Sequence, residues 1–259
     1  MVLTKVKSKM NRKVDLVGRE FETSKSGRCF VIDYKDSNNV LVMFYNPIYI
    51  ASCTYASLIK GFVENPIYPS VYGRGYIGVG KFSCKDVEVQ RIWRNLMSRA
   101  YCDEYHKTHP TYKDVEVCKE WYNFQNFAEW CVRQKGFGYK GLNGRSFSLD
   151  KDILSKGSKY YSPDTCCFVP NEVNLCVVSK VGKTSNVRQQ GTRWSARISK
   201  HGKEFYLGSF NSKEVAFQVY KEAKEDYVRE VAEKWKERID DKVYANLKDW
   251  KLARTLEEI

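Results

Sequence analysis

The first third of the chain alternates apolar and polar residues with a period of two, which is typical of half-buried β-strands. Phe30–Tyr34 and Val40–Tyr45 are rich in β-branched and aromatic residues, and the polar segment Asp36–Asn39 lies between them. This pattern predicts a β-hairpin within a small antiparallel sheet or barrel. The glycine-rich run Tyr72–Gly80 follows and predicts a turn or an exposed linker.

Helical periodicity begins after Cys84. Apolar residues recur at helical spacing in two segments, residues 89–100 and 121–131, and a polar loop, Asp103–Lys113, separates them. The segment Gly136–Gly144 contains four glycines and closes this part of the chain. Tryptophans at helical core spacing are expected to pack inside the protein, namely Trp93, Trp121, Trp130 and Trp235.

Beyond these helices, Ser146–Asn174 begins with strand-like residues and contains Ser162-Pro163-Asp164, a turn or helix-start signature. Strand-like alternation returns at Trp194–Ser199 and Phe205–Leu207, which predicts two or three short strands. Asn211-Ser212 then precedes a long predicted helix. Its apolar residues follow a four-residue spacing: Val215, Val219, Ala223, Tyr227, Val231, Trp235 and Ile239.

These patterns predict an α+β, multi-domain protein with three regions. Residues 1–82 are expected to form a basic arm (1–13) followed by a β-rich module. Residues 83–177 are expected to form a central mixed unit. Residues 178–259 are expected to form a sheet packed on one long helix, with a helical extension.

The composition favours a folded protein with a polyanionic partner. Of the 259 residues, 42% are hydrophobic and 14% aromatic, which is ample for packed cores, and the formal net charge is +13. Neither a membrane-spanning run nor the apolar segment of a secretory signal is present, so nucleic acid is favoured over a lipid surface. The nine cysteines include no C-x-x-C pair and are expected to be reduced, core-filling thiols.

The clearest candidate for nucleic-acid recognition is the stretch Leu175–Lys203, which contains seven Lys or Arg residues and no acid. On a strand, Arg193, Arg197 and Ser199 share one face, while Trp194, Ala196 and Ile198 share the other. Arginine can donate two hydrogen bonds to guanine in the major groove, and lysine can neutralise phosphates. The alternative is an ordinary solvated basic surface.

The same region resembles the ethylene-response-factor (APETALA-type) DNA-binding domain. The residues that carry the resemblance, over about 60 positions, are Trp194–Ile198, Lys203, Tyr206–Phe210, Glu214–Ala216 and Tyr220–Ala223. The resemblance implies a three-stranded sheet packed on one helix, with DNA contacts from the strands. Together with the basic character of the strands, it gives these expected DNA-binding residues: Arg188, Arg193, Trp194, Arg197, Ser199, Lys200, Lys203 and Tyr206.

The central region resembles phage-type HNH-like proteins, many of which are homing endonucleases. The similar segments are Ile92–Tyr101, Val115–Trp121, Ser148–Ile153 and Tyr161–Cys166. The resemblance implies a strand–strand–helix cradle that holds one divalent metal ion. An ethylene-response-type domain often follows this unit in such proteins, so the order of the modules supports the resemblance.

Metal-dependent cleavage of a phosphodiester needs oxygen ligands for the ion and a base that activates water. Asp150 and Asp152 are the candidate carboxylate ligands, and Asn171 and Asn174 are the nearest amides. The expected cofactor is one Mg²⁺ (or Mn²⁺) ion. Lys151 stands where HNH enzymes carry the catalytic histidine.

An ordinary lysine is protonated at neutral pH and cannot act as a base, so Lys151 is assigned to steadying the phosphate in a catalytic group with Asp150 and Asp152. Thr165 occupies the slot that usually holds asparagine in the family. The alternative is that Asp150 and Asp152 are ordinary carboxylates at the end of a strand, without a catalytic role.

A zinc site is not expected, because the candidate ligands have irregular spacing: Cys102, His106, His109 and Cys118.

The favoured function is therefore a phage-type DNA endonuclease that makes metal-dependent cuts in duplex DNA in the cytoplasm of an infected bacterial host. The alternative is a catalytically inactive DNA-binding protein, and a third possibility is an interaction protein that inhibits a host enzyme. Double-stranded DNA is the expected partner, without a membrane or a small-molecule substrate. The end of the chain, around Trp235, Tyr244 and Trp250, is a candidate for self-association or for binding a host protein.

Overall fold

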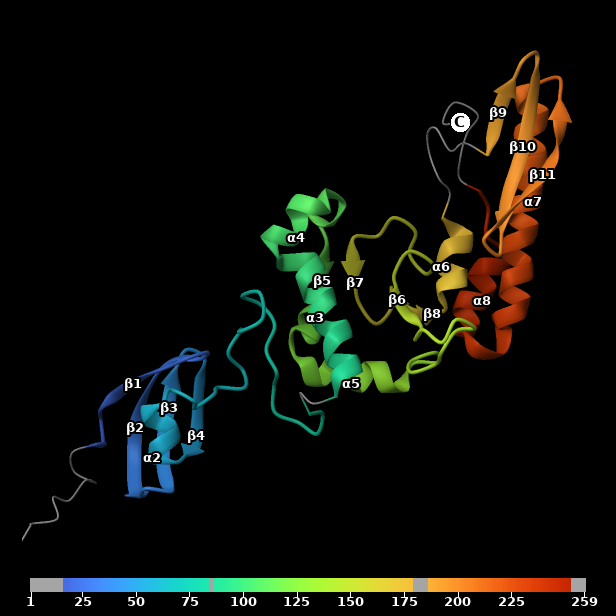
Figure 1. Ribbon diagram of the computed structural model, residues 1–259. Coiled ribbons are helices and arrows are strands. Elements are labelled where there is room, and N and C mark those ends of the chain that lie inside the picture. The colour runs from blue at the N-terminus through green and yellow to red at the C-terminus, as the bar shows by residue number, and fades with distance from the viewer. Residues whose placement is uncertain (1–15, 84–85, 179–185, 253–259) are drawn as a thin grey trace, which may run out of the picture. The chain divides into compact units, whose positions relative to one another are not determined.

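The structure is a computed structural model that describes residues 16–83, 86–178 and 186–252 (Figure 1). It is a mixed helix and sheet protein with several small sheets and a long C-terminal helix, so the coarse α+β expectation is confirmed. The basic arm expected over residues 1–13 lies outside the described residues. Within the described part of the chain, no helix combines the length and the apolar character that a membrane span needs.

The chain divides into two compact units, residues 1–128 and 129–259. The division falls inside helix α5 (Phe124–Arg133). The three-region division expected from composition stays a prediction.

An antiparallel sheet with the strand order β1-β2-β3-β4 forms the first part of unit 1. Its strands are β1 (Glu20–Thr23), β2 (Gly27–Asp36), β3 (Asn39–Tyr45) and β4 (Ile48–Cys53). The predicted hairpin is confirmed, since β2 and β3 pair and Asp36 lies opposite Asn39 across the turn. The carboxylate of Asp36 accepts a hydrogen bond from the backbone N–H of Asn38 (2.8 Å), which stabilises this turn.

The period-two pattern of β3 decides which face of this sheet is buried. Val40, Val42 and Phe44 are buried, whereas Leu41 and Tyr45 are exposed. Helix α2 (Tyr55–Ile59) contributes Leu58 to the buried side, and the Thr54 side chain caps the helix by accepting from the N–H of Ser57. One apolar face thus builds the core of this sheet.

The second part of unit 1 is mainly helical. Its elements are α3 (Val87–Tyr101), α4 (Asp103–Thr108), the short helix η1 (Pro110–Tyr112), β5 (Glu116–Val117), the short helix η2 (Lys119–Tyr122) and the start of α5. The first predicted helix is confirmed by α3. The second begins only at Phe124, because Asn123 has extended dihedral angles and separates α5 from η2, in which Trp121 is buried.

The glycine-rich run Tyr72–Gly80 starts as the expected turn but is not an exposed linker. Val71 and Gly75 pair across a tight turn, and the chain then packs against α3 and the start of α5. A Cβ on Gly75 would lie 2.8 Å from the ring of Trp93, and the backbone of Tyr76 bonds to Tyr122 and Phe124. Glycine is therefore needed here for close packing.

Replacing Gly78 with alanine is expected to destabilise unit 1 by about 2–4 kcal/mol. Gly78 has a positive φ of 73°, and its new Cβ would lie 2.1 Å from Oδ1 of Asn123. Gly73→Ala is the matched control, since Gly73 has a φ of 67° but open space around it. This control is expected to lower the stability of unit 1 by only about 1 kcal/mol. Denaturant unfolding of both variants would measure the difference, and equal losses would contradict the crowding at Asn123.

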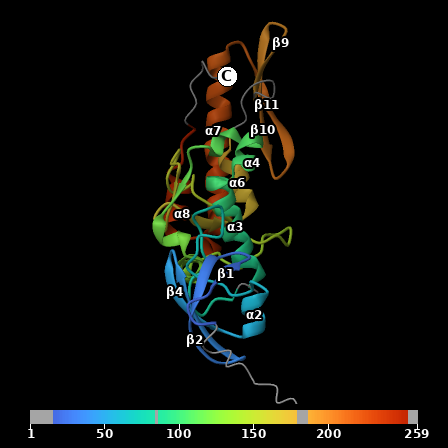
Figure 2. The ribbon, with the colours of Figure 1, turned by 90° about the vertical axis from the view of Figure 1, so that its left-hand side faces the viewer.

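Unit 2 contains a small strand–strand–helix motif followed by a second sheet on a long helix. The first part comprises β6 (Ser148–Asp150), β7 (Tyr160–Tyr161), β8 (Cys167–Val169) and α6 (Asn171–Val177). The second comprises β9 (Val187–Gln190), β10 (Arg193–Lys200), β11 (Lys203–Phe210), α7 (Lys213–Trp235), the short helix η3 (Lys236–Arg238) and α8 (Asp241–Lys248). Figures 1 and 2 both show the three strands lying alongside α7.

Helix α7 begins where expected, because the Ser212 side chain accepts a hydrogen bond from the N–H of Val215 (3.2 Å). The four-residue stripe predicted for its core is wrong at the N-terminal end, where Val215 is exposed and Phe217 and Tyr220 are buried instead. A helix has 3.6 residues per turn, so a strict four-residue spacing drifts around its surface. The helix also ends at Trp235, before Ile239.

The chain beyond α7 folds back on it. Val243 and Leu247 of α8 are buried, and the side chains of Tyr244 and Lys248 bond to Glu233 of α7. The buried carboxylate of Glu225 accepts from the N–H of Leu252 (3.3 Å) and pairs with Lys251. Residues 240–252 thus complete the core around the long helix.

Candidate nucleic-acid interface

The candidate interface is the sheet of order β11-β10-β9. A two-residue turn, His201-Gly202, joins β10 to β11, and both residues have positive φ angles of 51° and 77°. Such angles suit the twist of a tight hairpin, and glycine adopts them without strain. The predicted three-stranded sheet on one helix is present.

Strand register places the arginines on one side of this sheet. Arg188 lies opposite Ser195, and Arg197 lies opposite Tyr206, so these residues share a face with Arg193 by alternation. We call this surface the open face and define it by Arg188, Arg193, Arg197, Ser199 and Tyr206. The opposite side buries Ala196 and Ile198 against α7.

Two arginines of the open face are held by contacts to β11. The Nε–H of Arg193 donates to Oγ of Ser209 (3.0 Å), and its Nη2 donates to the Ser209 carbonyl (2.6 Å). Nη1 of Arg197 donates to Oε2 of Glu204 (2.8 Å), and its guanidinium lies 5.8 Å from the centre of the Tyr206 ring. Both side chains are therefore positioned before any ligand binds.

The structure does not bring every predicted contact residue to this face. Lys200 points to α7, where its ammonium lies 3.4 Å from the carboxylate of Glu230 and over the ring of Tyr227. Lys203 is exposed beside it at the hairpin end, in register with Lys200. Trp194 is half-buried on the helix side, with the ammonium of Lys213 over its ring. Contacts from these three residues to DNA stay predictions.

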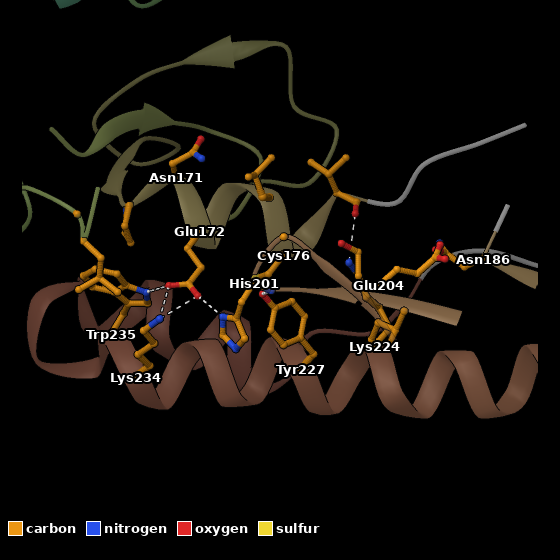
Figure 3. A pocket seen from close by; sticks show the side chains of 18 of the residues that line it. Asn171, Glu172, Cys176, Asn186, His201, Glu204, Lys224, Tyr227, Lys234 and Trp235 are labelled. Atoms are coloured by element: carbon orange, nitrogen blue, oxygen red, sulfur yellow. Dashed lines mark hydrogen bonds and ion pairs between the residues drawn. The ribbon is translucent and has the colours of Figure 1, made fainter. Parts of the chain in front are cut away.

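A carboxylate that the sequence analysis missed anchors the tip of this hairpin. Glu172, in the first turn of α6, accepts hydrogen bonds from Lys234 and from Nε1 of Trp235 on α7 (both 2.8 Å), and its other oxygen lies 2.8 Å from Nδ1 of His201 (Figure 3). Burial acts to raise the pKa of Glu172, but the hydrogen bonds from Lys234, Trp235 and His201 outweigh it and lower the pKa from its ordinary 4.5. We call this group the Glu172 junction.

A cavity of about 800 Å³ lies beside the Glu172 junction, between α6, α7 and the hairpin tip. Asn171 and Cys176 of α6 and the buried Lys224 of α7 line it, and Lys224 donates to the carbonyl of Val178 (3.3 Å) (Figure 3). Asn171 therefore lies on the side of α6 that faces this cavity. Asp152 instead lines a different cavity, of about 630 Å³, together with Val177.

The expected catalytic group lies at the end of β6. The carboxylate of Asp150 accepts a hydrogen bond from the N–H of Ile153 (3.0 Å). Burial raises the pKa of this carboxyl, helped by the nearby charge of Asp152 and opposed by the Ile153 N–H. Lys151 pairs with Asp152 and also lies over the ring of Tyr161. Thr165 lies in a turn, where its hydroxyl donates to the Tyr160 carbonyl (2.8 Å).

The two predicted amide ligands differ in exposure, since Asn171 is exposed and the amide oxygen of Asn174 is buried. Its Oδ1 is buried and accepts no hydrogen bond within the described residues. It lies one turn before Val177, which shares a cavity with Asp152. Asn171 is directed to the other cavity, so the structure does not bring all four predicted metal ligands together.

No group of three or more His, Cys, Asp or Glu side chains that could hold a metal ion occurs in the part of the chain that the structure describes. The residues weighed for zinc make other contacts: the Nε2 atom of His106 lies 2.8 Å from the Arg99 carbonyl, and His109 stacks on Tyr105. The eight described cysteines are free thiols. A metal at Asp150 and Asp152 would thus need a further oxygen ligand such as Asn174.

Comparison of the chain with protein-family models, with curated proteins and with solved structures found no match. The resemblances to ethylene-response-factor and HNH-like proteins therefore stay predictions from motifs.

Proposed function

We propose that this protein binds duplex DNA through the open face of the β9–β11 sheet. The observation that carries the proposal is the placement of Arg188, Arg193 and Arg197 on one accessible side of the sheet. Over residues 187–210 the chain has five Lys or Arg residues and a single acid, Glu204. A surface of this kind is complementary to a phosphate backbone.

The shape of the sheet supports the major groove as the binding place. The groove is wide enough to accept a two-stranded β-ribbon, and several DNA-binding proteins read it with strands. Arg193 and Arg197 are already oriented by Ser209 and Glu204, so little side-chain entropy would be lost when they contact bases. Helix α7 supports the sheet from behind and keeps its face rigid.

A salt titration of binding tests the proposal directly. The full chain is mixed with a fluorescently labelled duplex and the anisotropy is followed as salt rises. The logarithm of the affinity is expected to fall linearly with the logarithm of the salt concentration, with a slope of about −0.9 for each phosphate contacted. Absence of binding to any duplex, even in dilute buffer, would overturn the proposal.

Cleavage of the bound DNA is a second candidate function. The observation in its favour is the strand–strand–helix order at the predicted site: β6 and β8 pair antiparallel, and α6 follows β8 directly. Carboxylate and amide oxygens, such as those of Asp150, Asp152 and Asn174, are the ligand type that a hard divalent cation prefers, and cleavage would require these three side chains to converge on one ion. Such an ion would supply positive charge to stabilise the phosphate during hydrolysis.

In this second candidate function, Lys151 would hold a phosphate oxygen near the carboxylates. Lys151 is not the base, since it is paired with Asp152.

The test of cleavage is the nicking of supercoiled plasmid in the presence of Mg²⁺ or Mn²⁺. Asp150→Asn keeps an acceptor for the Ile153 N–H but removes the charge, and it is expected to abolish nicking. Asp164→Ala, which changes an exposed turn residue, is expected to nick like the wild type. If the wild type nicks no plasmid with either ion, the hypothesis of nuclease activity is rejected, and the DNA-binding proposal still stands.

A further inference from the structure

Unit 1 carries an open cleft that the proposed function does not use. It has a volume of about 690 Å³ and lies between the tight turn at Val71–Gly75 and the helices α3 and α4. The side chains of Tyr72, Arg74, Tyr101, Lys107 and Lys113 line it, together with one carboxylate, Asp103. Its walls are therefore polar and rich in basic and tyrosine side chains.

The charge of the cleft is positive and only partly compensated. Lys107 pairs with Glu104 of its own helix. Arg74 and Lys113 are exposed, and neither has a carboxylate partner within residues 16–83, 86–178 and 186–252. Arg74 and Lys113 outnumber Asp103, the one carboxylate among the residues that line the cleft, so the cleft favours an anion over a neutral or apolar ligand.

The arginine of this cleft is held in position. Its guanidinium lies 5.9 Å from the centre of the Tyr101 ring. The hydroxyl of Tyr101 lies 3.0 Å from that of Tyr122 and accepts a hydrogen bond from the N–H of Val117 (3.1 Å). An arginine that lies over a fixed ring loses part of its conformational freedom, and its N–H groups can still donate to a phosphate.

The turn beside the cleft holds an exposed aromatic residue in an unfavourable backbone conformation. Tyr72 has a φ of 50°, which is uncommon for a residue with a bulky side chain, and its side chain remains 44% exposed. Hydrogen bonds from the N–H of Gly75 and from the N–H of Val71 close the turn (2.8 and 2.9 Å). Strain of this kind persists where the surroundings impose it, and it is concentrated at functional sites.

We propose that this cleft is a second DNA-contact site, in which Arg74 and Lys113 bind phosphates of the duplex backbone and the Tyr72 side chain lies against the same strand. The inference rests on the proposed function and adds a surface of unit 1 to it. Its role is to raise affinity without reading sequence, because phosphate contacts carry no base information. The cleft is open to solvent, which suits the backbone of a long polymer.

The test compares the double variant Arg74→Ala/Lys113→Ala with the wild type in the anisotropy titration, using a duplex of about three helical turns. Affinity is expected to fall about tenfold, and the salt slope to become shallower by about 2. The matched control is Lys35→Ala/Lys60→Ala, which removes two exposed lysines of the same unit away from the cleft. It is expected to change affinity by less than about threefold.

Tyr72→Gly separates a binding role from a structural one. Glycine adopts a positive φ without strain, so this variant is expected to unfold at the same temperature or higher and yet to bind DNA more weakly. This inference alone would be overturned if the wild type binds DNA, the Arg193→Ala/Arg197→Ala variant binds more weakly, and the Arg74→Ala/Lys113→Ala variant binds with the affinity of the wild type. A wild type that binds no duplex would overturn the proposed function, and this inference with it.

Discussion

The double replacement Arg193→Ala/Arg197→Ala is expected to weaken binding to duplex DNA by about two orders of magnitude. Each arginine is positioned on the open face by a neighbour on β11, and a well-placed arginine contact to a base is worth about 1–3 kcal/mol. If the side chains contact phosphates instead, the salt slope is expected to become shallower by about 2. Anisotropy titrations of wild type and variant at several salt concentrations measure both effects.

The control for this experiment is Lys236→Ala/Lys242→Ala. It removes the same charge from exposed positions in η3 and α8, away from the open face. Its affinity is expected to stay within about threefold of the wild type, since a distant charge acts only through the screened field of the protein. Circular dichroism and thermal unfolding show whether the arginine variant keeps its fold. Equal losses in the two double variants would mean that DNA does not bind at the open face.

Removal of the Glu172 carboxylate is expected to lower the free energy of unfolding of unit 2 by about 2–4 kcal/mol. Glu172→Ala leaves Lys234, the Nε1–H of Trp235 and the ring of His201 without their common acceptor, in a setting where the side chain of Glu172 is only 20% exposed. The hairpin tip also loses its attachment to α6. Denaturant unfolding measures the loss, with Glu237→Ala, an exposed glutamate of η3, as the control.

The pH dependence of unfolding gives a second, independent readout of the same junction. Because the folded state lowers the pKa of Glu172, the carboxylate adds stability above its unfolded pKa of about 4.5, and this stability is lost as the pH falls through the folded pKa. Glu172→Gln is expected to flatten the fall in stability of unit 2 below pH 4.5. Part of the slope is expected to remain, since Glu225 and Glu230 have lowered pKa values as well. A variant with the wild-type slope would show that the junction is not formed.

Several elements were predictable from the chain alone because their signals are local. The β2–β3 hairpin follows from alternation interrupted by Asp36–Asn39, and α7 starts at the serine that caps it. Lys200 is out of phase with Arg193 and Arg197 along the strand, so the chain alone already indicated the opposite side, although Lys200 was predicted to contact DNA. What was not visible was its partner Glu230, which lies thirty residues further on in α7.

The packing of the glycine-rich run Tyr72–Gly80, by contrast, could not be predicted from local signals. A run of glycines indicates a turn or linker when it is read locally, and only the packed structure shows that Trp93 and Asn123 occupy the space that side chains would need. The Asn171 and Asn174 amides also look equivalent in sequence. Their different positions around α6 direct one to the large cavity beside the Glu172 junction and leave the other with a buried oxygen that has no hydrogen-bond partner in the described part of the chain.

By itself, the sequence determined the basic character of the protein, the period-two strands, the caps and the helical segments, because charge, periodicity and turn chemistry act between near neighbours in the chain. Tertiary structure alone decided which cations remain available and which are neutralised, and it created the Glu172 junction from α6, the β10–β11 hairpin and α7. The physical reason is that burial and ion pairing depend on the folded surface, where residues 29 to 63 positions apart become direct partners.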